Sequence, residues 1–357
     1  MEWKTEQLGN LITIKYGKDH KKLKDGPFPV YGSGGIMRFV DTAIYNKPSL
    51  LLPRKGSLNN IMFTDKPFWT VDTMFWSIID ESKIEPKFLY YAMCKKNLVA
   101  LNVGTSVPSL TVPVLEDVSI PYPPIPIQRK IAGILSALDS KIENNNKINA
   151  NLEAQAQALF KSWFVDFTPF KDQPFVDSEL GPIPQGWKVG KLGDICTFKR
   201  GKNLLSKNAI DEGVPVVAGG LSPSCYHNQA NTSAPVVTVS GSGANAGFMR
   251  MYHVDVWASD CSFIDVSCDY LYFVYCFLSV NRRLLKHAQT GAVQPHVKPA
   301  DIHDFDVVIP EEDIVKAFQS IIKELLTKVG VNEKENQRLA ALRDTLLPKL
   351  MSGEIKL

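Results

Sequence analysis

A stripe of apolar residues with the period of an α-helix runs through residues 127–164 of this chain. The stripe advances in steps of three and four residues, and Asn145 and Asn149 keep its phase where apolar residues are missing. No Gly or Pro follows Gly133 in this stretch, so nothing there stops a helix early. At about 1.5 Å per residue such a helix spans roughly 57 Å and leaves its apolar face uncovered. A second helix, in this chain or in a partner, is therefore required.

The chain supplies that helix, because most of its sequence pattern occurs twice. Residues 3–18 match residues 187–202 at a constant offset (187 − 3 = 184), and Trp69 recurs as Trp257. The helical stripe recurs at residues 314–351. A repeat of roughly 185 residues indicates a duplicated domain followed by a long helix, and it excludes a solenoid of short repeats.

The two stripes predict one antiparallel helix pair with Asn in the middle of each seam. A buried Asn costs stability but fixes the register of a helix pair, so we expect Asn to face Asn. An alternative is that the Asn residues, together with Gly330, break each stretch into two shorter helices. We expect Pro348 to end or kink the second helix near its last turn. The predicted seam residues are Ile131, Leu135, Leu138, Ile142, Asn145, Asn149, Leu152, Leu159 and Trp163 with Phe318, Ile322, Leu325, Val329, Asn332, Asn336, Leu339, Leu346 and Leu350.

The rest of the sequence predicts two mixed domains, each preceding its own long helix. Short β-like runs alternate with Gly, Pro and Asn clusters, and one further helix is expected at residues 86–100. The fold class is therefore α+β, with two mixed α/β domains related by a pseudo-two-fold axis and joined by two long antiparallel coiled-coil helices. The predicted ranges are 1–124 for the first domain, 125–166 for its helix, 167–186 for a linker, 187–310 for the second domain, and 311–357 for the second helix and tail.

Composition and motifs exclude several classes of function. The net charge is only +3, so any basic surface must be local. The start lacks the apolar core of a signal peptide and the longest apolar run is too short to cross a bilayer, which favours a cytoplasmic protein with no membrane role. We find no H-E-x-x-H, no G-x-S-x-G and no Asn/Asp-Pro-Pro-Tyr/Phe motif. We therefore expect no catalytic residue and no cofactor in this chain.

The six Cys residues include no C-x-x-C pair. Cys261, Cys268 and His253 resemble a set of metal ligands, but their spacing matches no zinc pattern, which favours ordinary reduced thiols and no metal. The stretch at residues 241–247, GSGANAG, lacks the Lys-Ser/Thr of a P-loop and the spacing of G-x-G-x-x-G. A loop whose backbone approaches another group closely is the better interpretation.

Basic residues and polar loop residues recur at matching places in the two domains. Lys and Arg near phosphates supply affinity for DNA, while Ser, Thr, Asn, Gln and Arg on loops read base edges. Any single Lys is more simply a solvated surface charge, and only the recurrence of the set supports DNA binding. The candidates are Lys15, Lys18, Arg54, Lys55, Ser57, Thr105 and Ser106 in the first domain, and Lys199, Arg200, Lys202, Ser240, Ser242, Asn245, Arg250, Gln294, His296 and Lys298 in the second.

Four longer motifs resemble one known family across the whole chain. They are PPIPIQRKIAGILSALDSKIENNN at residues 123–146, LFKSWFVDF at 159–167, GPIPQGW at 181–187 and RLAALRDTLLPKLMSGEI at 338–355. Together with the two Trp-Lys openings, they resemble the specificity subunit of type I restriction–modification systems.

The resemblance implies two target recognition domains, each reading half of a gapped, bipartite sequence in double-stranded DNA, with the helices as the spacer. It implies no catalysis in this chain. It also implies two methylase (modification) subunits using S-adenosylmethionine, and restriction/translocase subunits using ATP and Mg²⁺, so that these cofactors lie on partner subunits. Two other hypotheses stay open: a free-standing DNA-modifying enzyme, and a coiled-coil scaffold whose domains bind protein.

Overall fold

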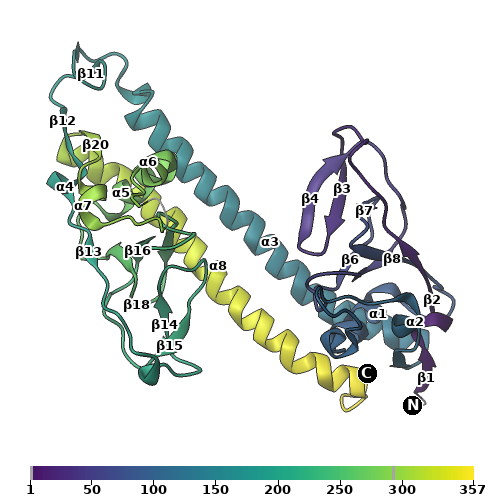
Figure 1. Ribbon diagram of the computed structural model, residues 1–357. Coiled ribbons are helices and arrows are strands. Elements are labelled where there is room, and N and C mark those ends of the chain that lie inside the picture. Colours follow the sequence, from purple (N-terminus) through teal and green to yellow (C-terminus); the bar gives the residue numbers. More distant parts are fainter. Residues whose placement is uncertain (1–2, 292–293) are drawn as a thin grey trace. The chain divides into compact units, whose positions relative to one another are not determined.

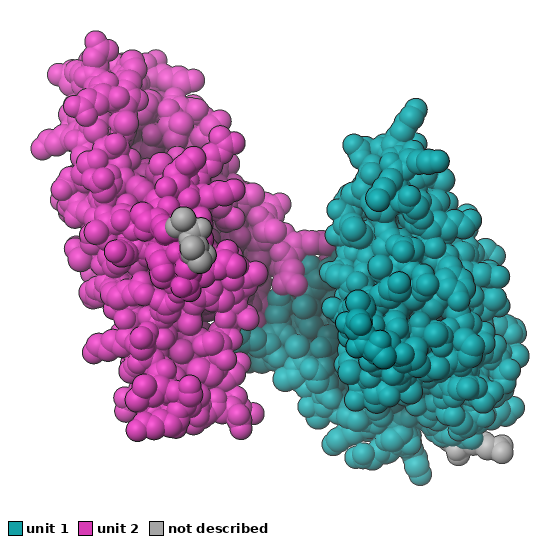
Figure 2. Space-filling view, in the orientation of Figure 1, with its two compact units in different colours: residues 1–143, 336–357 teal, residues 144–335 magenta. Residues whose placement is uncertain are grey.

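The computed structural model describes residues 3–291 and 294–357. The chain forms two compact units, of which unit 1 comprises residues 1–143 and 336–357 and unit 2 comprises residues 144–335 (Figure 2). Two long helices, α3 (Ile125–Phe164) and α8 (Glu312–Ser352), each begin in one unit and continue without a break into the other (Figure 1). Each unit therefore contains one mixed domain, called its head below, and half of both helices. The predicted ranges differ from this division because they gave each helix a segment of its own.

The head of unit 1 contains short strands and two short α-helices. Their bounds are β1 Lys4–Gln7, β2 Ile12–Tyr16, β3 Phe28–Gly32, β4 Gly35–Val40, β5 Ser49–Pro53, β6 Met62–Thr64, β7 Trp69–Thr70, β8 Met74–Ile79, β9 Ser119–Tyr122, α1 Pro86–Cys94 and α2 Val112–Glu116, with 3-10 turns η1 Leu8–Asn10 and η2 Leu98–Leu101. The strands form a two-stranded sheet β1-β9, a four-stranded sheet β2-β8-β5-β6 and a three-stranded sheet β4-β3-β7. All pairings are antiparallel except β3 with β7.

The head of unit 2 repeats this topology. Its elements are β12 Lys188–Lys191, α4 Leu192–Ile195, β13 Lys199–Arg200, η4 Ser206–Asn208, β14 Val214–Val217, β15 Cys225–His227, β16 Val236–Ser240, β17 Met249–Tyr252, β18 Trp257–Ala258, β19 Cys261–Ile264, α5 Leu271–Val280, α6 Arg282–His287, α7 Pro299–His303 and β20 Asp306–Ile309. The sheets are β12-β20, β13-β19-β16-β17 and β15-β14-β18, and again only the last contains a parallel pair. The repeat seen in the sequence is thus a repeat of strand order.

The segment between α3 and the second head is irregular, as its Pro content predicts. It contains the 3-10 turn η3 (Thr168–Phe170) and a small ladder of β10 (Phe175–Val176) with β11 (Ile183–Pro184). No helix among the described residues is long and apolar enough to cross a membrane.

Each head buries its apolar core against the helix halves of its own unit. In unit 1 the cluster that contains Phe88 of α1 also includes Ile131 and Leu135 of α3 and Leu350 of α8. In unit 2 aromatic rings dominate, and Phe160 of α3 lies 5.3 Å from Phe273 and 5.9 Å from Phe318 between ring centroids. Burial of this area is the main contribution that holds the heads on the helices.

The predicted seam residues are all buried or half-buried. The buried ones are Ile131, Leu135, Asn145, Asn149, Phe318, Ile322, Val329, Asn332 and Leu350, and the half-buried ones are Leu138, Ile142, Leu152, Leu159, Trp163, Leu325, Asn336, Leu339 and Leu346. The prediction missed Phe160, Phe164, Val315 and Leu326, which are buried more deeply than Leu138 or Leu159. These four residues lie on the side of each helix that the heads cover. A prediction that considers only contacts between the two helices does not include them.

The helix halves run antiparallel within each unit. In unit 2 the Asn332 side-chain amide donates to Asn149 Oδ1 at 2.8 Å, and Asn145 donates to Glu335 Oε2 at 2.8 Å. In unit 1 the Arg343 guanidinium donates to Asp139 Oδ1 at 2.8 Å. Because α3 and α8 are continuous through these positions, the alternative of two shorter helices per stretch is wrong.

One boundary prediction agrees with the structure and one needs correction. Helix α8 ends at Ser352, about one turn after Pro348, as expected for a Pro near the last turn. The helix expected at residues 86–100 stops at Cys94. There Asn97 accepts a hydrogen bond from the Ala100 N–H and starts the separate turn η2.

Candidate nucleic-acid interface

In head 1 the Gly-Lys pair that closes the opening motif docks on two neighbouring strands, β7 and β8, through main-chain bonds. The Gly17 N–H donates to Met74 O at 3.0 Å, and the Lys18 N–H donates to Thr70 O at 2.8 Å. The Trp69 indole N–H then donates to Lys18 O at 3.0 Å. A Cβ on Gly17 would overlap the backbone carbonyl that follows Thr70, so only glycine fits there.

Head 2 repeats this turn bond for bond. The Gly201 N–H donates to Cys261 O and the Lys202 N–H donates to Ala258 O, both at 2.9 Å. The Trp257 indole N–H donates to Lys202 O at 2.8 Å. Gly201 is as tightly enclosed by backbone as its counterpart. The Trp, Gly and Lys that recur in the sequence therefore form one structural element, which presents a lysine at the same place in each head.

Two predicted loops of head 1 are joined into one surface beside this turn. The Leu110 N–H donates to Arg54 O at 2.9 Å, and the Gly56 N–H donates to Pro108 O at 3.0 Å. Lys55 also forms an isolated β-bridge with Ser109. The exposed candidates on this surface are Lys55, Ser57, Thr105 and Ser106.

The same joint occurs in head 2. The Val297 N–H donates to Gly241 O and the Gly243 N–H donates to Pro295 O, both at 3.1 Å, and Ser242 bridges His296. A cavity of about 340 Å³ opens here, lined by Arg200, Gly241, His296, Lys298 and Pro299. Three predicted candidates thus line one cavity. Ala292 and Val293, which belong to the repeated loop, lie outside the described residues.

An aspartate that was not among the predicted candidates joins two of them, Arg200 and Ser242. Both the Arg200 guanidinium and the Ser242 hydroxyl donate hydrogen bonds to the Asp260 carboxylate. In head 1 the matching residue is Asp72, whose backbone carbonyl accepts a hydrogen bond from Arg54 Nη1 at 3.0 Å. The Arg54 guanidinium also lies over the Tyr16 ring, 5.3 Å from its centroid. The recurrence of Trp-x-x-Asp in both halves was the signal that could have found these aspartates.

Two candidates lie apart from this cluster. Ser240 is only 3% exposed at the end of β16, an interior strand of the four-stranded sheet, and no side-chain or main-chain group bonds its hydroxyl among the described residues. The Arg250 guanidinium lies 3.5 Å from Glu333 of α8 and 5.0 Å from the Tyr252 ring centroid, so it packs the head onto the helix. Neither residue belongs to the candidate surface.

The remaining candidates are placed around the cluster. Lys15 and Lys199 are exposed on equivalent strands, and each is paired across its sheet with an aromatic residue. Gln294 is exposed and Asn245 is half-buried in the loops that border the cavity.

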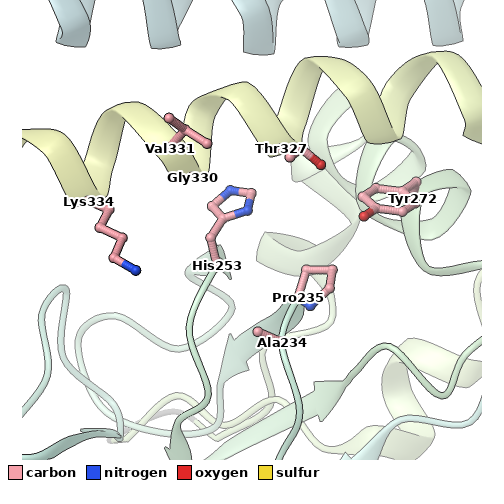
Figure 3. A pocket seen from close by; sticks show the side chains of 8 residues that line it. All are labelled: Ala234, Pro235, His253, Tyr272, Thr327, Gly330, Val331 and Lys334. Carbon is pink, nitrogen blue, oxygen red and sulfur yellow. The ribbon is translucent and has the colours of Figure 1, made fainter.

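A different cavity of about 290 Å³ lies between head 2 and α8 and contains none of the predicted candidates (Figure 3). The His253 ring points toward α8 beside Gly330, where a Cβ would come within 2.6 Å of the His253 Cβ. Burial lowers the pKa of His253 to about 4, with a smaller contribution from Arg250. Gly330 therefore allows close packing of the head and does not break the helix.

The cysteines have no metal-binding arrangement in the part of the chain that the structure describes. All six are free thiols, and no group of three or more His, Cys, Asp or Glu residues is placed to hold a metal ion there. Burial raises the pKa of the Cys261 thiol to about 12, which keeps it neutral.

The comparison with protein families is decided by one match that covers both repeats. The model of the type I restriction modification DNA specificity domain matches residues 1–154 and 184–343. The chain belongs to this family. In this specificity-domain protein, each matched segment contains one head together with half or more of the long helix that follows it.

Individual specificity subunits resemble the chain over most of its length. It is 30% identical to the type I restriction enzyme MjaIX specificity subunit of Methanocaldococcus jannaschii over 341 residues, covering 88% of this chain and 79% of that protein. It is 25% identical to the putative type I specificity subunit S.MpnORF638P of Mycoplasma pneumoniae, covering 98% and 96% of the two chains. The crystal structure of a type I restriction–modification S subunit from M. genitalium shares the fold, with a TM-score of 0.67, 20% identity, and coverage of 98% and 96%.

Proposed function

We propose that the chain is the DNA-reading subunit of a type I restriction–modification complex, and that each head reads one half of a gapped, bipartite site in double-stranded DNA. One observation carries the proposal. Both heads build the same turn and the same pair of joined loops from main-chain bonds, yet they display different side chains on it. A shared frame with different side chains suits two half-sites of different sequence.

The chemistry of the displayed side chains supports DNA as the ligand. Flexible lysines at the border of each cluster supply sequence-independent attraction to phosphates. Hydroxyl, amide and imidazole groups in the joined loops are able to bond base edges. The residues we propose for these roles are Lys15, Lys18, Lys55, Ser57, Thr105, Ser106, Lys199, Lys202, Ser242, Asn245, Gln294, His296 and Lys298.

We also propose that α3 and α8 form the spacer that sets the gap between the half-sites. Each helix runs through both units as one element of 40 or 41 residues, and the buried Asn149–Asn332 pair holds the register of the two. A helix pair with a fixed register is stiff, which is what a constant gap requires.

Methylation and cleavage are assigned to partner subunits in this proposal. Two methylase subunits would bring S-adenosylmethionine, and restriction/translocase subunits would bring ATP and Mg²⁺. The complex would act in the cytoplasm. Family membership supports these assignments, because the relatives are named specificity subunits.

The test is to assemble the chain with the methylase subunit of its own source organism and to sequence the methylated DNA. We expect methylation at one gapped two-part motif, and none from the chain alone. Methylation without a gapped motif would reject the bipartite model, and methylation or cleavage by the chain alone would identify a free-standing enzyme.

A binding titration at several salt concentrations separates DNA reading from a protein-binding scaffold. We expect the logarithm of the binding constant to fall with the logarithm of salt concentration by about 0.9 per phosphate contact. If the chain does not bind DNA, or if its affinity for DNA does not depend on salt, the protein-binding scaffold is favoured.

A further inference from the structure

We propose that Arg54 in head 1 and Arg200 in head 2 are the specificity-determining arginines of the two half-sites, each donating two hydrogen bonds to one guanine. The inference rests on the proposed function and concerns the same surface. It names one residue in each head, although the two residues do not occupy equivalent sequence positions.

Strand register shows that the head 1 residue equivalent to Arg200 is Tyr16 and not Arg54. Tyr16 pairs with Phe75 in β2-β8, and Arg200 pairs with Ser262 in β13-β19. Because these ladders are equivalent in strand order, Tyr16 occupies in head 1 the position that Arg200 occupies in head 2.

A second pair of equivalent positions follows β5 in head 1 and β16 in head 2, and there the arginine is in head 1. The carbonyl of Arg54 accepts from the Leu110 N–H, and the carbonyl of Gly241 accepts from the Val297 N–H, in the joint that both heads share. Arg54 is therefore the counterpart of Gly241. Each head therefore has an arginine at one of these two equivalent positions, and the two heads use different ones.

The two side chains cross so that their guanidinium groups reach the same region. The Arg54 guanidinium extends over the Tyr16 ring at 5.3 Å. In head 2 the Arg200 guanidinium lies where a side chain on Gly241 would start, since a Cβ there would overlap Arg200 Nη1. Gly241 is thus the space that Arg200 requires.

Both guanidinium groups are anchored on equivalent aspartates. Arg54 Nη1 donates to the backbone carbonyl of Asp72 at 3.0 Å, while Arg200 donates to the Asp260 side chain. Such an anchor orients the guanidinium plane and leaves the other N–H groups for a ligand. The Arg200 side chain remains 46% exposed, so its unused donors are accessible.

An oriented, accessible guanidinium fits the two hydrogen-bond acceptors of guanine in the major groove. This geometry favours base recognition over a non-specific contact with phosphate. Phosphate contacts are already available from nearby flexible lysines, Lys18 and Lys55 in head 1 and Lys202 and Lys298 in head 2. Arg250 provides a contrast, because Glu333 and Tyr252 hold it against α8.

The experiment uses the complete chain assembled with its methylase subunits and compares Arg54→Ala with Arg200→Ala. The readouts are the methylated motif and binding to duplexes that carry each base at each site position. We expect each variant to lose discrimination at one guanine in one half-site by roughly 5- to 150-fold, the range of a bidentate pair. The other half-site should be unchanged.

Two matched arginines serve as controls because they lie outside the cluster. Arg38→Ala in head 1 removes an arginine paired with Asp25, and Arg250→Lys in head 2 keeps a cation beside Glu333. Both should keep the wild-type motif. A uniform loss of affinity on all sequences, with a salt slope smaller by about 1, would show that Arg54 or Arg200 contacts phosphate and would overturn the inference.

A swap variant tests whether an arginine at the other position reaches the same region. Its recovery of function would also show that the single variant had not simply failed to fold. Arg54→Gly should lose guanine discrimination in the first half-site. Tyr16→Arg combined with Arg54→Gly rebuilds the arrangement of head 2 and should restore it. If the double variant reads no better than the single one, the positional exchange is wrong. If the wild-type assembly methylates no gapped motif, the proposed function fails, whereas a wild-type motif that survives both Arg→Ala changes rejects this inference alone.

Discussion

Asn332 of α8 donates its side-chain N–H to Oδ1 of Asn149 in α3 across 2.8 Å, and the two side chains are 1% and 9% exposed. Asn149 in turn donates to the Val329 carbonyl at 3.5 Å. An apolar pair of this size would pack at least as well, so the amides do not serve stability alone. They admit one register of the helices and disfavour registers that leave an amide unpaired.

The first prediction concerns this amide pair. Asn332→Leu should lower the free energy of unfolding by about 1–3 kcal/mol, because it leaves the buried Asn149 oxygen without its donor. Asn149→Leu combined with Asn332→Leu should recover most of that loss, since no buried amide then lacks a partner. Urea unfolding followed by circular dichroism measures both. A double variant less stable than the single one would contradict the assignment.

The second prediction concerns helix length. Four residues inserted after Glu143 in α3 and four after Glu335 in α8 lengthen both helices where the two units meet in the sequence. The addition is roughly 6 Å, or slightly more than one helical turn. At about 3.4 Å per base pair, the gap between half-sites should grow by about two base pairs while both half-sites keep their sequences.

The control for this change uses the same insertion elsewhere. Four residues placed between the exposed Glu179 and Leu180 lengthen only the irregular segment between α3 and head 2. Sequencing of methylated DNA should then show the original gap. A changed half-site sequence after the helix insertion, or a changed gap after the control insertion, would refute the spacer role.

The third prediction concerns pH. The pKa of His253 falls from 6.5 to about 4 on folding, because the ring is buried against α8. Between these values the unfolded chain binds the proton more readily than the folded chain, so stability is full above pH 6.5 and decreases as the pH falls. From pH 7 to pH 5 the loss should be about 1–2 kcal/mol.

The measurement compares urea midpoints of the wild-type chain and His253→Gln at both pH values. The variant should lose less stability on acidification, because its side chain does not titrate. An equal loss in the two proteins would show that other groups cause the pH dependence.

The fourth prediction concerns Asp139 in unit 1. Its carboxylate accepts from Arg343 Nη1 at 2.8 Å and from the Tyr91 hydroxyl at 2.6 Å, and burial with this bond raises the pKa of Tyr91. Asp139→Ala should cost about 1–3 kcal/mol in unfolding free energy, because it removes the acceptor of a buried hydroxyl. Asp344→Ala removes the exposed partner of Arg343 and should cost under about 1 kcal/mol. Thermal or urea unfolding distinguishes the two, and equal losses would reject the role of Asp139.

The parts of the fold that produce a periodic or repeated pattern in the sequence were predictable. The helical stripe predicts α3 and α8, and a constant offset predicts that the heads repeat. The buried Asn pair follows from the phase of the stripe. The helix expected at residues 86–100 was too long, because the apolar pattern does not reveal that Asn97 caps a separate turn.

The site was predictable only in part, because its geometry depends on main-chain bonds between distant segments. Composition identified the basic and polar loop residues but not that Gly56 bonds Pro108, or that Gly243 bonds Pro295. Arg250 has the residue type of a DNA contact, yet a glutamate 83 positions away holds it on α8. Asp260 was overlooked because a carboxylate repels phosphates, and the sequence does not show that Arg200 neutralises it.

The joint that both heads share, Gly56 with Pro108 in head 1 and Gly243 with Pro295 in head 2, is made by peptide groups. Every residue type except proline carries the same N–H and C=O, so most substitutions at Lys55, Ser57 or Ser242 leave these bonds in place. The frame does constrain its glycines, such as the enclosed Gly17 and Gly201 and the positive-φ Gly56 and Gly243. Point mutation at these positions therefore changes the chemistry that a head displays without first costing the head its fold.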